Sequence, residues 1–284
     1  FAPARNASRQ REVVEALRQG PQRVVELAAT IPGAASAVTA LAKRGVVAVE
    51  DRRQVRGREG TSLSSAAAPR PEQLTDGQVK ALSAIDAARE RGTGDVVLVD
   101  GVTGSGKTEV YLDAIEHALA EGRGALVLVP EISLTAQTVG RFRSRFGDDV
   151  AVLHSRLSAG ERFDQWDLVR RGEAHVVVGA RSALFAPLAD PGLIIIDEEH
   201  ESSYKQDSSP RYHAREVAAR MARDRGCALV LGSATPSLEA LRRCEVGVHG
   251  GVSWTRVSMP ERPGCATLPK VTVVDMAEQF RGGG

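Results

Sequence analysis

The residues best suited to chemistry form one short run, which reads Gly-Val-Thr-Gly-Ser-Gly-Lys-Thr over residues 101–108. The run matches the Walker A pattern, in which a glycine-rich loop cradles phosphate groups. It follows an apolar stretch typical of a buried strand, residues 96–100, and it opens the helical pattern of residues 107–120. A phosphate-binding loop needs this strand-loop-helix setting. The alternative, a glycine-rich turn that holds no ligand, is less favoured because the setting and the whole pattern agree.

Each residue type in the run has a physical role. Gly104 and Gly106 allow backbone N–H groups to close around the β- and γ-phosphates of a nucleotide. Lys107 supplies a positive charge to the same oxygens, and the hydroxyl of Thr108 is a ligand for the magnesium ion that accompanies ATP. The nucleotide-binding residues predicted from this run are Gly101, Gly104, Ser105, Gly106, Lys107 and Thr108.

A second apolar stretch, residues 193–196, delivers two carboxylates, Asp197 and Glu198, at its carboxyl end. In an open parallel sheet the ligand lies outside the carboxyl ends of the strands, so these acids are placed as in a Walker B strand. Asp197 is the expected partner of magnesium through water, and Glu198 is the base that orients the attacking water. Two surface acids after a buried strand are the alternative, which the Walker A run disfavours. The predicted catalytic residues are Lys107, Asp197 and Glu198, and the predicted magnesium ligands are Thr108 and Asp197.

Small hydroxyl side chains follow a third apolar stretch, in the run Gly232-Ser-Ala-Thr-Pro236. We expect Ser233 and Thr235 to lie at the same sheet edge as the carboxylates. Thr235 also suits a structural role, as the N-cap of a helix whose first residue is Pro236. His200, which ends the run Asp-Glu-Glu-His, is placed to link these hydroxyls to the hydrolysis site, although a lone histidine is commonly a packing residue.

The elements that must position these residues are six apolar stretches that alternate with helical patterns. They are residues 96–100, 125–130, 150–155, 176–180, 193–198 and 228–233. Stretches that are apolar on both faces and separated by helices form a parallel sheet covered on both sides. We therefore predict an α/β fold in which a mostly parallel sheet carries the phosphate-binding loop and helices cover both faces.

A smaller domain is predicted ahead of this sheet. Its three helices are Asn6–Gln19, Val24–Ala29 and Ala34–Lys43. Residues 46–55 then read as two short strands, VVAVE and RRQVR, joined by a polar pair. This order predicts a winged helix-turn-helix domain over residues 1–60. Residues 61–73 lack apolar periodicity and read as a linker, which leaves residues 74–284 as the second domain.

Charge and composition narrow the class of protein. The 284 residues include 37 Lys and Arg against 36 Asp and Glu, a net charge of +1, so no overall basic field points to nucleic acid. Residues 1–60 are the basic end, with 11 Lys and Arg against 6 Asp and Glu. The three cysteines form no Cys-x-x-Cys pair, so neither a disulfide framework nor a zinc site in this chain is supported. No run approaches the ~18 apolar residues of a membrane span and no signal sequence opens the chain, which predicts a cytoplasmic protein.

The three motifs, in this order and each at a strand end, resemble motifs I, II and III of superfamily 2 helicases. The sequence in and around these motifs resembles the PriA family. The stretches that carry the resemblance are GVTGSGKTEVY, VPEISLT, GARSALFAPL, DEEHESSYKQDSSPRYHARE and GSATPSLEAL. The likeness runs from about Leu74 onward, and the predicted winged helix lies where that family has one. It implies a RecA-like first helicase lobe that uses ATP and Mg²⁺.

The same resemblance implies a function and partners. The implied function is an ATP-dependent motor of replication fork restart and primosome assembly, of the 3′ to 5′ DNA helicase class. The implied partners are single-stranded and forked DNA, primosome proteins and single-strand-binding proteins, with no membrane, in the cytoplasm at the nucleoid. An alternative remains: a primosome loader that recognises DNA structure and binds ATP but does not unwind DNA. A P-loop kinase is disfavoured because the second and third motifs have no role in small-molecule phosphoryl transfer.

Further site residues follow from the resemblance. Residues 130–133 and 179–182 correspond to loops that face single-stranded DNA, and Arg181 and Ser182 suit contacts to phosphate. Gln78 occupies the place of a glutamine that reads the adenine edge. The run Thr75-Asp-Gly-Gln78 is also a capping box, in which Gln78 only caps its own helix, and both interpretations stay open.

Residues 201–215 correspond to an aromatic-rich loop that reports DNA occupancy to the ATP site. Aromatic rings stack on bases and cations hold phosphates, whereas a solvated loop with incidental tyrosines is the alternative. The residues predicted to bind DNA or to couple it to hydrolysis are Arg181, Ser182, His200, Tyr204, Lys205, Arg211, Tyr212, Arg215, Ser233 and Thr235.

The predicted winged helix carries its own basic surface. The cations are Lys43, Arg44, Arg52, Arg53, Arg56 and Arg58, of which Arg52 and Arg53 are the predicted DNA contacts. Winged helices also serve as docks for proteins, so binding of a protein partner is the alternative.

Two expected parts of such a motor are not found in the sequence. No second RecA-like lobe with an arginine finger follows, and the zinc-binding cysteines expected of the full-length family have no counterpart here. The chain begins at Phe1 and ends in three glycines, and we interpret it as a fragment of a longer protein that does not unwind DNA by itself.

Overall fold

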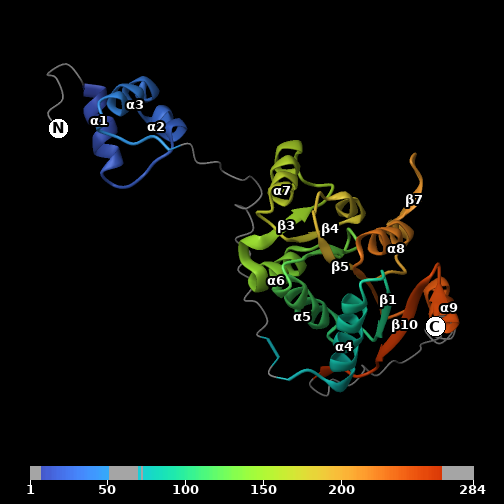
Figure 1. Cartoon of the computed structure of the whole chain (residues 1–284). Coiled ribbons are helices and arrows are strands. Elements are labelled where there is room, and N and C mark those ends of the chain that lie inside the picture. Colours follow the sequence, from blue (N-terminus) through green and yellow to red (C-terminus); the bar gives the residue numbers. More distant parts are fainter. Residues whose placement is uncertain (1–7, 51–69, 72, 264–284) are drawn as a thin grey trace, which may run out of the picture. The chain divides into compact units, whose positions relative to one another are not determined.

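A computed structural model describes residues 8–50, 70–71 and 73–263 (Figure 1). The chain divides into two compact units, Phe1–Gln54 and Val55–Gly284. Within the described ranges, none of the helices is long and apolar enough to cross a lipid bilayer.

The first unit contains the helices α1 (Ser8–Leu17), α2 (Val24–Thr30) and α3 (Ala34–Lys43). All three were predicted, and α3 has the predicted bounds. They pack around a small apolar core that consists of Val13, Leu27, Ala34, Ala37, Val38 and Leu41. The helical pattern of the sequence therefore places one apolar stripe of each helix in a common interior.

The first strand of the predicted wing does not form in the described residues. Residues 46–50 have no strand, and the N–H of Val46 donates to the carbonyl of Leu41 at 3.0 Å, which closes the end of α3. Val46 and Val47 pack against the helical core instead of pairing with a second strand. The other predicted strand, with Arg52, Arg53, Arg56 and Arg58, lies outside the described residues. The winged helix and its DNA contacts therefore stay predictions.

In the described part of the second unit, eight strands form one sheet in the order β3-β4-β2-β5-β8-β1-β10-β9. All six predicted strands form: β1 (Val96–Gly101), β2 (Gly124–Leu128), β3 (Val150–Leu153), β4 (Val176–Gly179), β5 (Pro191–Ile196) and β8 (Ala228–Ser233). Their pairings are parallel, and only β9 and β10 pair antiparallel within this sheet. The predicted α/β architecture with a mostly parallel sheet is confirmed.

Two strands of the sheet were not predicted, β9 (Val248–His249) and β10 (Val252–Met259). β10 pairs in parallel with β1, yet half of its residues are polar and several are exposed. A strand near the edge of a sheet needs no continuous apolar run, so the pattern that identifies the buried strands is absent here.

Helices cover both faces of the sheet (Figure 1). One face packs against α4 (Asp76–Arg91), α5 (Lys107–Ala120) and α6 (Ala136–Phe146). The other packs against α7 (Ala159–Arg171), α8 (Ala214–Arg225) and α9 (Leu238–Val246). Alternate residues of one strand serve the two cores: Val97 and Val99 point to the first, and Leu98 points to the second. This alternation explains why the strands are apolar throughout.

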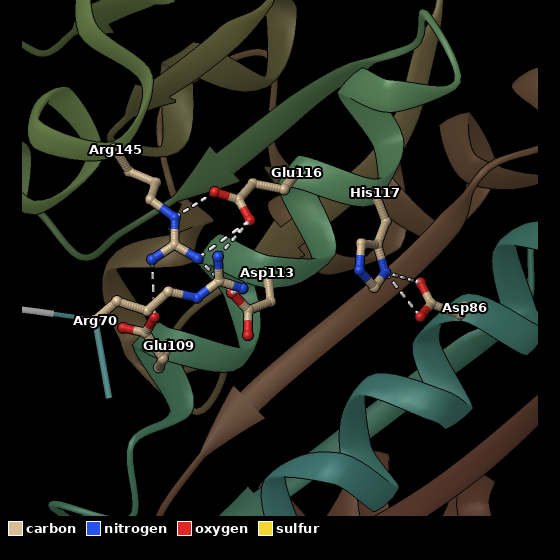
Figure 2. A network of polar contacts seen from close by, with 7 residues as sticks. All are labelled: Arg70, Asp86, Glu109, Asp113, Glu116, His117 and Arg145. Atoms are coloured by element: carbon tan, nitrogen blue, oxygen red, sulfur yellow. Dashed lines mark hydrogen bonds and ion pairs between the residues drawn. The ribbon is translucent and has the colours of Figure 1, made fainter. Parts of the chain in front are cut away.

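The outer face of α5 is held by a network of charges that Figure 2 shows. Arg145 of α6 contacts Glu109 at 3.0 Å, Asp113 at 2.5 Å and also Glu116. Arg70, from the segment before α4, reaches the Asp113 carboxylate at 3.0 Å. Because α5 begins at the Walker A lysine, this network fixes the helix that carries the phosphate-binding loop.

We expect Arg145→Ala to lower the free energy of unfolding by about 2 kcal/mol, because Asp113, with only 3% of its side chain exposed, would keep a buried charge with one fewer partner. The hydrogen bond from Arg145 is the largest cause that lowers the pKa of Glu116. A carboxyl group whose pKa is lower in the folded than in the unfolded protein stabilises the fold when the pH is above its unfolded pKa. That stabilisation is lost as the pH falls through the folded pKa. The difference between wild type and variant should therefore shrink below about pH 4.

Urea unfolding at pH 7 and pH 3.5 measures both effects. Arg242→Ala is the matched control, since its ion pair with Glu245 is 74% and 67% exposed and should contribute only about 0.5 kcal/mol. Equal losses in the two variants would contradict the assigned role of Arg145.

Candidate functional site

The Walker A run forms the predicted loop between β1 and α5. Gly104 and Gly106 have φ values of 84° and 83°, a left-handed conformation that residues with a Cβ rarely adopt. The Lys107 ammonium donates to the carbonyl of Gly101 at 2.8 Å and lies 3.9 Å from Oε1 of Glu198. The loop therefore brings the predicted lysine to the predicted hydrolysis carboxylate.

Gln78 lies directly against this loop. Its Oε1 accepts the N–H of Thr75 at 2.8 Å and its backbone N–H donates to the Thr75 hydroxyl, which confirms the capping box. Its Nε2 donates to the carbonyl of Ser105 at 3.2 Å. A Cβ on Gly106 would lie only 2.2 Å from this Nε2, so the contact requires glycine there. The contact to adenine stays a prediction.

The carboxylates follow β5 as predicted, and a buried tyrosine holds the first of them. The hydroxyl of Tyr111 donates to Oδ1 of Asp197 at 3.0 Å. Burial, reinforced by the neighbouring charge of Glu198, raises the pKa of Asp197 to about 6. Tyr111 passes directly over Gly232, where a Cβ would lie 1.6 Å from the tyrosine hydroxyl. Gly232 therefore leaves the space that the Tyr111 hydroxyl occupies. This role was not identified from the sequence.

Glu198 has a strained backbone. Its φ is 46°, and within the described ranges it is the only non-glycine residue with a positive φ. Such strain costs of order 1–3 kcal/mol and persists only where neighbouring contacts impose it. Here Glu199 imposes it, because its N–H donates to the carbonyl of Gly232 at 3.0 Å and turns the chain immediately after Glu198.

His200 joins the second motif to the third, as predicted. Its Nδ1 lies 2.7 Å from the hydroxyl of Ser233, and the same ring nitrogen is 3.7 Å from Oε2 of Glu198. The Ser233 hydroxyl also accepts the N–H of Thr235 at 3.0 Å. The prediction that Thr235 caps the next helix is wrong. Ser237 is the N-cap of α9, because Pro236 does not begin the helix and the Ser237 hydroxyl accepts the N–H of Ala240.

A buried ion pair fixes the second motif from the other side. Glu199 is 1% exposed, and its carboxylate accepts from Arg215 at 2.8 Å and from the N–H of Ser237 at 2.6 Å. Sequence reasoning missed Glu199 and Ser237. It also assigned Arg215 to DNA, which the structure contradicts: Arg215 is 7% exposed and its guanidinium neutralises Glu199. A buried carboxylate requires such a partner, which the sequence pattern alone does not identify.

Tyr204 does not offer its ring to a base, which corrects the predicted stacking role. The residue is 1% exposed, and its single O–H is shared between the carbonyl of Asp197 at 2.6 Å and that of Leu128 at 3.1 Å. The surrounding residues form a short turn and the hairpin of β6 (Lys205–Gln206) and β7 (Tyr212–His213). Tyr204 thus ties the segment before this hairpin to the backbone of Asp197.

Arg181 binds the same segment from the neighbouring loop. Its guanidinium donates to the carbonyls of Ser203 and Lys205, the two residues that flank Tyr204. It also lies 5.7 Å from the ring centroid of Tyr212, and this ring packs edge-on against Phe185. Arg181 is therefore engaged by protein groups rather than directed freely to solvent.

A cavity of about 270 Å³ lies where the predicted DNA loops meet this segment. It is lined by Val129, Pro130, Glu131, Ser155, Arg162, Ala180, Arg181, Ser182, Ser203, Tyr204 and Gln206. Ser182 is exposed at its edge, while Lys205 and Arg211 are exposed on and beside the hairpin. The structure brings the two loops and the hairpin together, so all three can touch one ligand.

The residues present fit a magnesium nucleotide. The hydroxyl of Ser105 is buried and has no hydrogen-bond partner among the described residues, and the ammonium of Lys107 contacts a neutral carbonyl at 2.8 Å. Both groups suit phosphate oxygens. Thr108 and Asp197 would hold the magnesium ion that comes with the nucleotide. Within the described ranges, no group of three or more His, Cys, Asp or Glu is arranged to bind a metal by itself.

Comparison with known proteins agrees with this geometry. The family model of DEAD/DEAH box helicases matches residues 75–244. The replication restart protein PriA of Bacillus subtilis is 52% identical over 213 residues, which are 75% of this chain and 26% of that protein. PriA of Synechocystis is 43% identical over 268 residues, which are 93% of this chain and 31% of that protein. The chain therefore spans about a quarter to a third of the length of these relatives.

Among solved structures, RecG bound to a three-way DNA junction resembles the chain with a TM-score of 0.50 and 22% identity. The match covers 75% of this chain and 27% of RecG. At this identity the likeness concerns the fold alone, and it agrees with a RecA-like lobe.

We predict that Gly232→Ala lowers the free energy of unfolding by about 1–3 kcal/mol, because the new methyl group overlaps the Tyr111 hydroxyl. The cost should fall in a Tyr111→Phe background, where the overlapping oxygen is gone. Urea unfolding of both single variants and the double variant measures this coupling. Strictly additive losses would show that Gly232 and Tyr111 do not constrain each other.

Proposed function

The chain belongs to the DEAD/DEAH box helicases, in their PriA family, and from this membership we propose that it is the ATP-hydrolysing lobe of a DNA motor for replication fork restart and primosome assembly. In the full-length protein this motor is a 3′ to 5′ helicase. The observation that carries the proposal is the meeting of Lys107, Asp197 and Glu198 at one sheet edge.

ATP binding assigns a task to each of these residues. Backbone N–H groups of the loop and the start of α5 hold the β- and γ-phosphates, and Lys107 exchanges the Gly101 carbonyl for phosphate oxygens. Thr108 and Asp197 would hold magnesium, which would neutralise charge on the phosphates. A cation beside Asp197 favours the ionised carboxylate and so opposes the effect of burial on its pKa.

Hydrolysis depends on Glu198, which orients a water molecule toward the γ-phosphate. Its strained backbone holds the carboxylate toward the Lys107 side of the loop. His200 bridges Glu198 and Ser233, so a shift of either motif changes the position of the base. The hydrolysis residues that this lobe supplies, Lys107, Asp197 and Glu198, favour a motor over a loader that binds ATP without using it.

DNA is the proposed second ligand of this lobe. The cavity between the loops and the hairpin receives single-stranded DNA, with Ser182, Lys205 and Arg211 as contacts at its edge. A strand that competes for the Arg181 guanidinium shifts residues 203–205, and Tyr204 passes that shift to the backbone of Asp197. In the first unit, the winged helix binds duplex or forked DNA through Arg52 and Arg53. The proposed protein partners are primosome and single-strand-binding proteins.

Lys107→Ala should abolish detectable binding of a fluorescent ATP analogue at micromolar protein, because it removes the cationic side chain predicted to hold the β- and γ-phosphates. The exposed Lys80→Ala on α4 is the control and should bind normally. A folded Lys107→Ala chain with unchanged affinity would refute the Walker A assignment.

Tyr204→Phe tests the coupling, because it keeps the buried ring and removes only the hydroxyl that holds Asp197 and Leu128. In the full-length protein, we expect it to retain ATP affinity while the stimulation of ATPase by single-stranded DNA falls several-fold. Glu198→Gln should retain ATP but lose hydrolysis with and without DNA. Full stimulation of Tyr204→Phe would mean that the hairpin is not the coupling element.

A further inference from the structure

A short segment after β10, residues 260–263, lies against the Walker A loop, although no sequence motif marked it. β10 runs parallel to β1 with Met259 in register with Gly101. The carbonyl of Met259 accepts the N–H of Val102 at 3.2 Å. The chain therefore leaves the sheet beside the phosphate-binding loop.

Two residues of this segment flank the glycines of the loop. A Cβ built on Gly104 would lie 3.8 Å from Cδ and Nε of Arg262, and one built on Gly106 would lie 3.7 Å from Cγ of Pro263. These are ordinary packing distances for an added methyl group, so the stem of Arg262 lies beside the loop at Gly104. The side chain is half-buried, and no hydrogen bond or ion pair to another residue in the described ranges engages its guanidinium.

The position of the Glu198 carboxylate indicates whether Arg262 lies near the γ-phosphate or near the nucleoside of a bound nucleotide. Lys107 and Glu198, 3.9 Å apart, fix the end where the γ-phosphate is attacked. The nucleoside must then leave along another flank of the loop, and Gln78, Arg262 and Pro263 border it at Gly104 and Gly106. Gln78 already uses both atoms of its amide, to cap α4 and to hold Ser105. On the same flank, the guanidinium of Arg262 is a polar group with no partner in the described ranges and can meet the nucleoside.

We propose that Arg262 binds the nucleoside of ATP, with its planar guanidinium packed on the face of the adenine ring and Pro263 beside it. Arginine suits this role because its flat, weakly hydrated cation stacks on aromatic rings. The inference rests on the proposed ATP site and adds to it a residue that discriminates a nucleotide from a bare polyphosphate.

Binding of ADP and of inorganic tripolyphosphate to the 284-residue chain tests the proposal by calorimetry. Arg262→Ala should raise the Kd for ADP by about 2- to 30-fold, equivalent to ~0.5–2 kcal/mol, and leave the Kd for tripolyphosphate unchanged. Arg262→Gln, which keeps much of the stem and loses the cation, should behave alike. Arg220→Ala is the control, since that exposed arginine of α8 pairs with Asp224 and lies outside the loop.

An equal loss of affinity for ADP and tripolyphosphate would overturn the proposal and place the guanidinium on phosphate. An unchanged Kd for ADP in folded Arg262→Ala and Arg262→Gln would show that Arg262 does not contact the nucleotide, and would overturn the proposal. A wild-type chain that binds neither ligand would refute the ATP site itself, so the two failures are distinguishable.

Discussion

Strands β5, β8 and β1 are neighbours in one parallel sheet, and the site depends on that order. Adjacent strands lie about 4.8 Å apart, so the residues that follow them at their carboxyl ends come within reach of one another. Three motifs that are distant in sequence thereby meet: the loop after β1, the carboxylates after β5 and the serine that ends β8. The register of the pairs, such as Asp100 with Ser233, leaves little freedom in how they meet.

Buried polar groups determine how tightly this edge is held. Three buried groups next to the carboxylates have defined partners: Tyr111 with Asp197, Arg215 with Glu199, and Tyr204 with two backbone carbonyls. Losing one partner would leave a buried polar group uncompensated, a cost of about 1–3 kcal/mol or more for a charge. The strained Glu198 lies between these fixed points. A displacement of the hairpin is therefore transmitted to Glu198 through these buried hydrogen bonds.

Apolar periodicity predicted the sheet and the helices well because burial dominates those elements, and the Walker A and Walker B residues are placed as their patterns indicated. Side-chain contacts were predictable only where a motif always makes the same hydrogen bonds, as the capping box of Thr75 and Gln78 does. The sequence pattern could not distinguish an exposed tyrosine from a buried one, so Tyr204 was assigned to stacking although its hydroxyl faces the interior. Arg215 was misassigned for the same reason, since its partner Glu199 is contributed by another element. Residues 260–263 carry no motif and approach the loop only because β10 pairs with β1.

The central claim is that the ATP site and the hairpin of residues 205–213 form one mechanical unit joined by Tyr204. Hydrogen exchange with and without a non-hydrolysable ATP analogue tests it directly, because exchange reports local opening of backbone hydrogen bonds. We expect slower exchange both in the loop of residues 101–108 and in residues 199–206. Protection confined to the loop, with residues 199–206 unchanged, would contradict it.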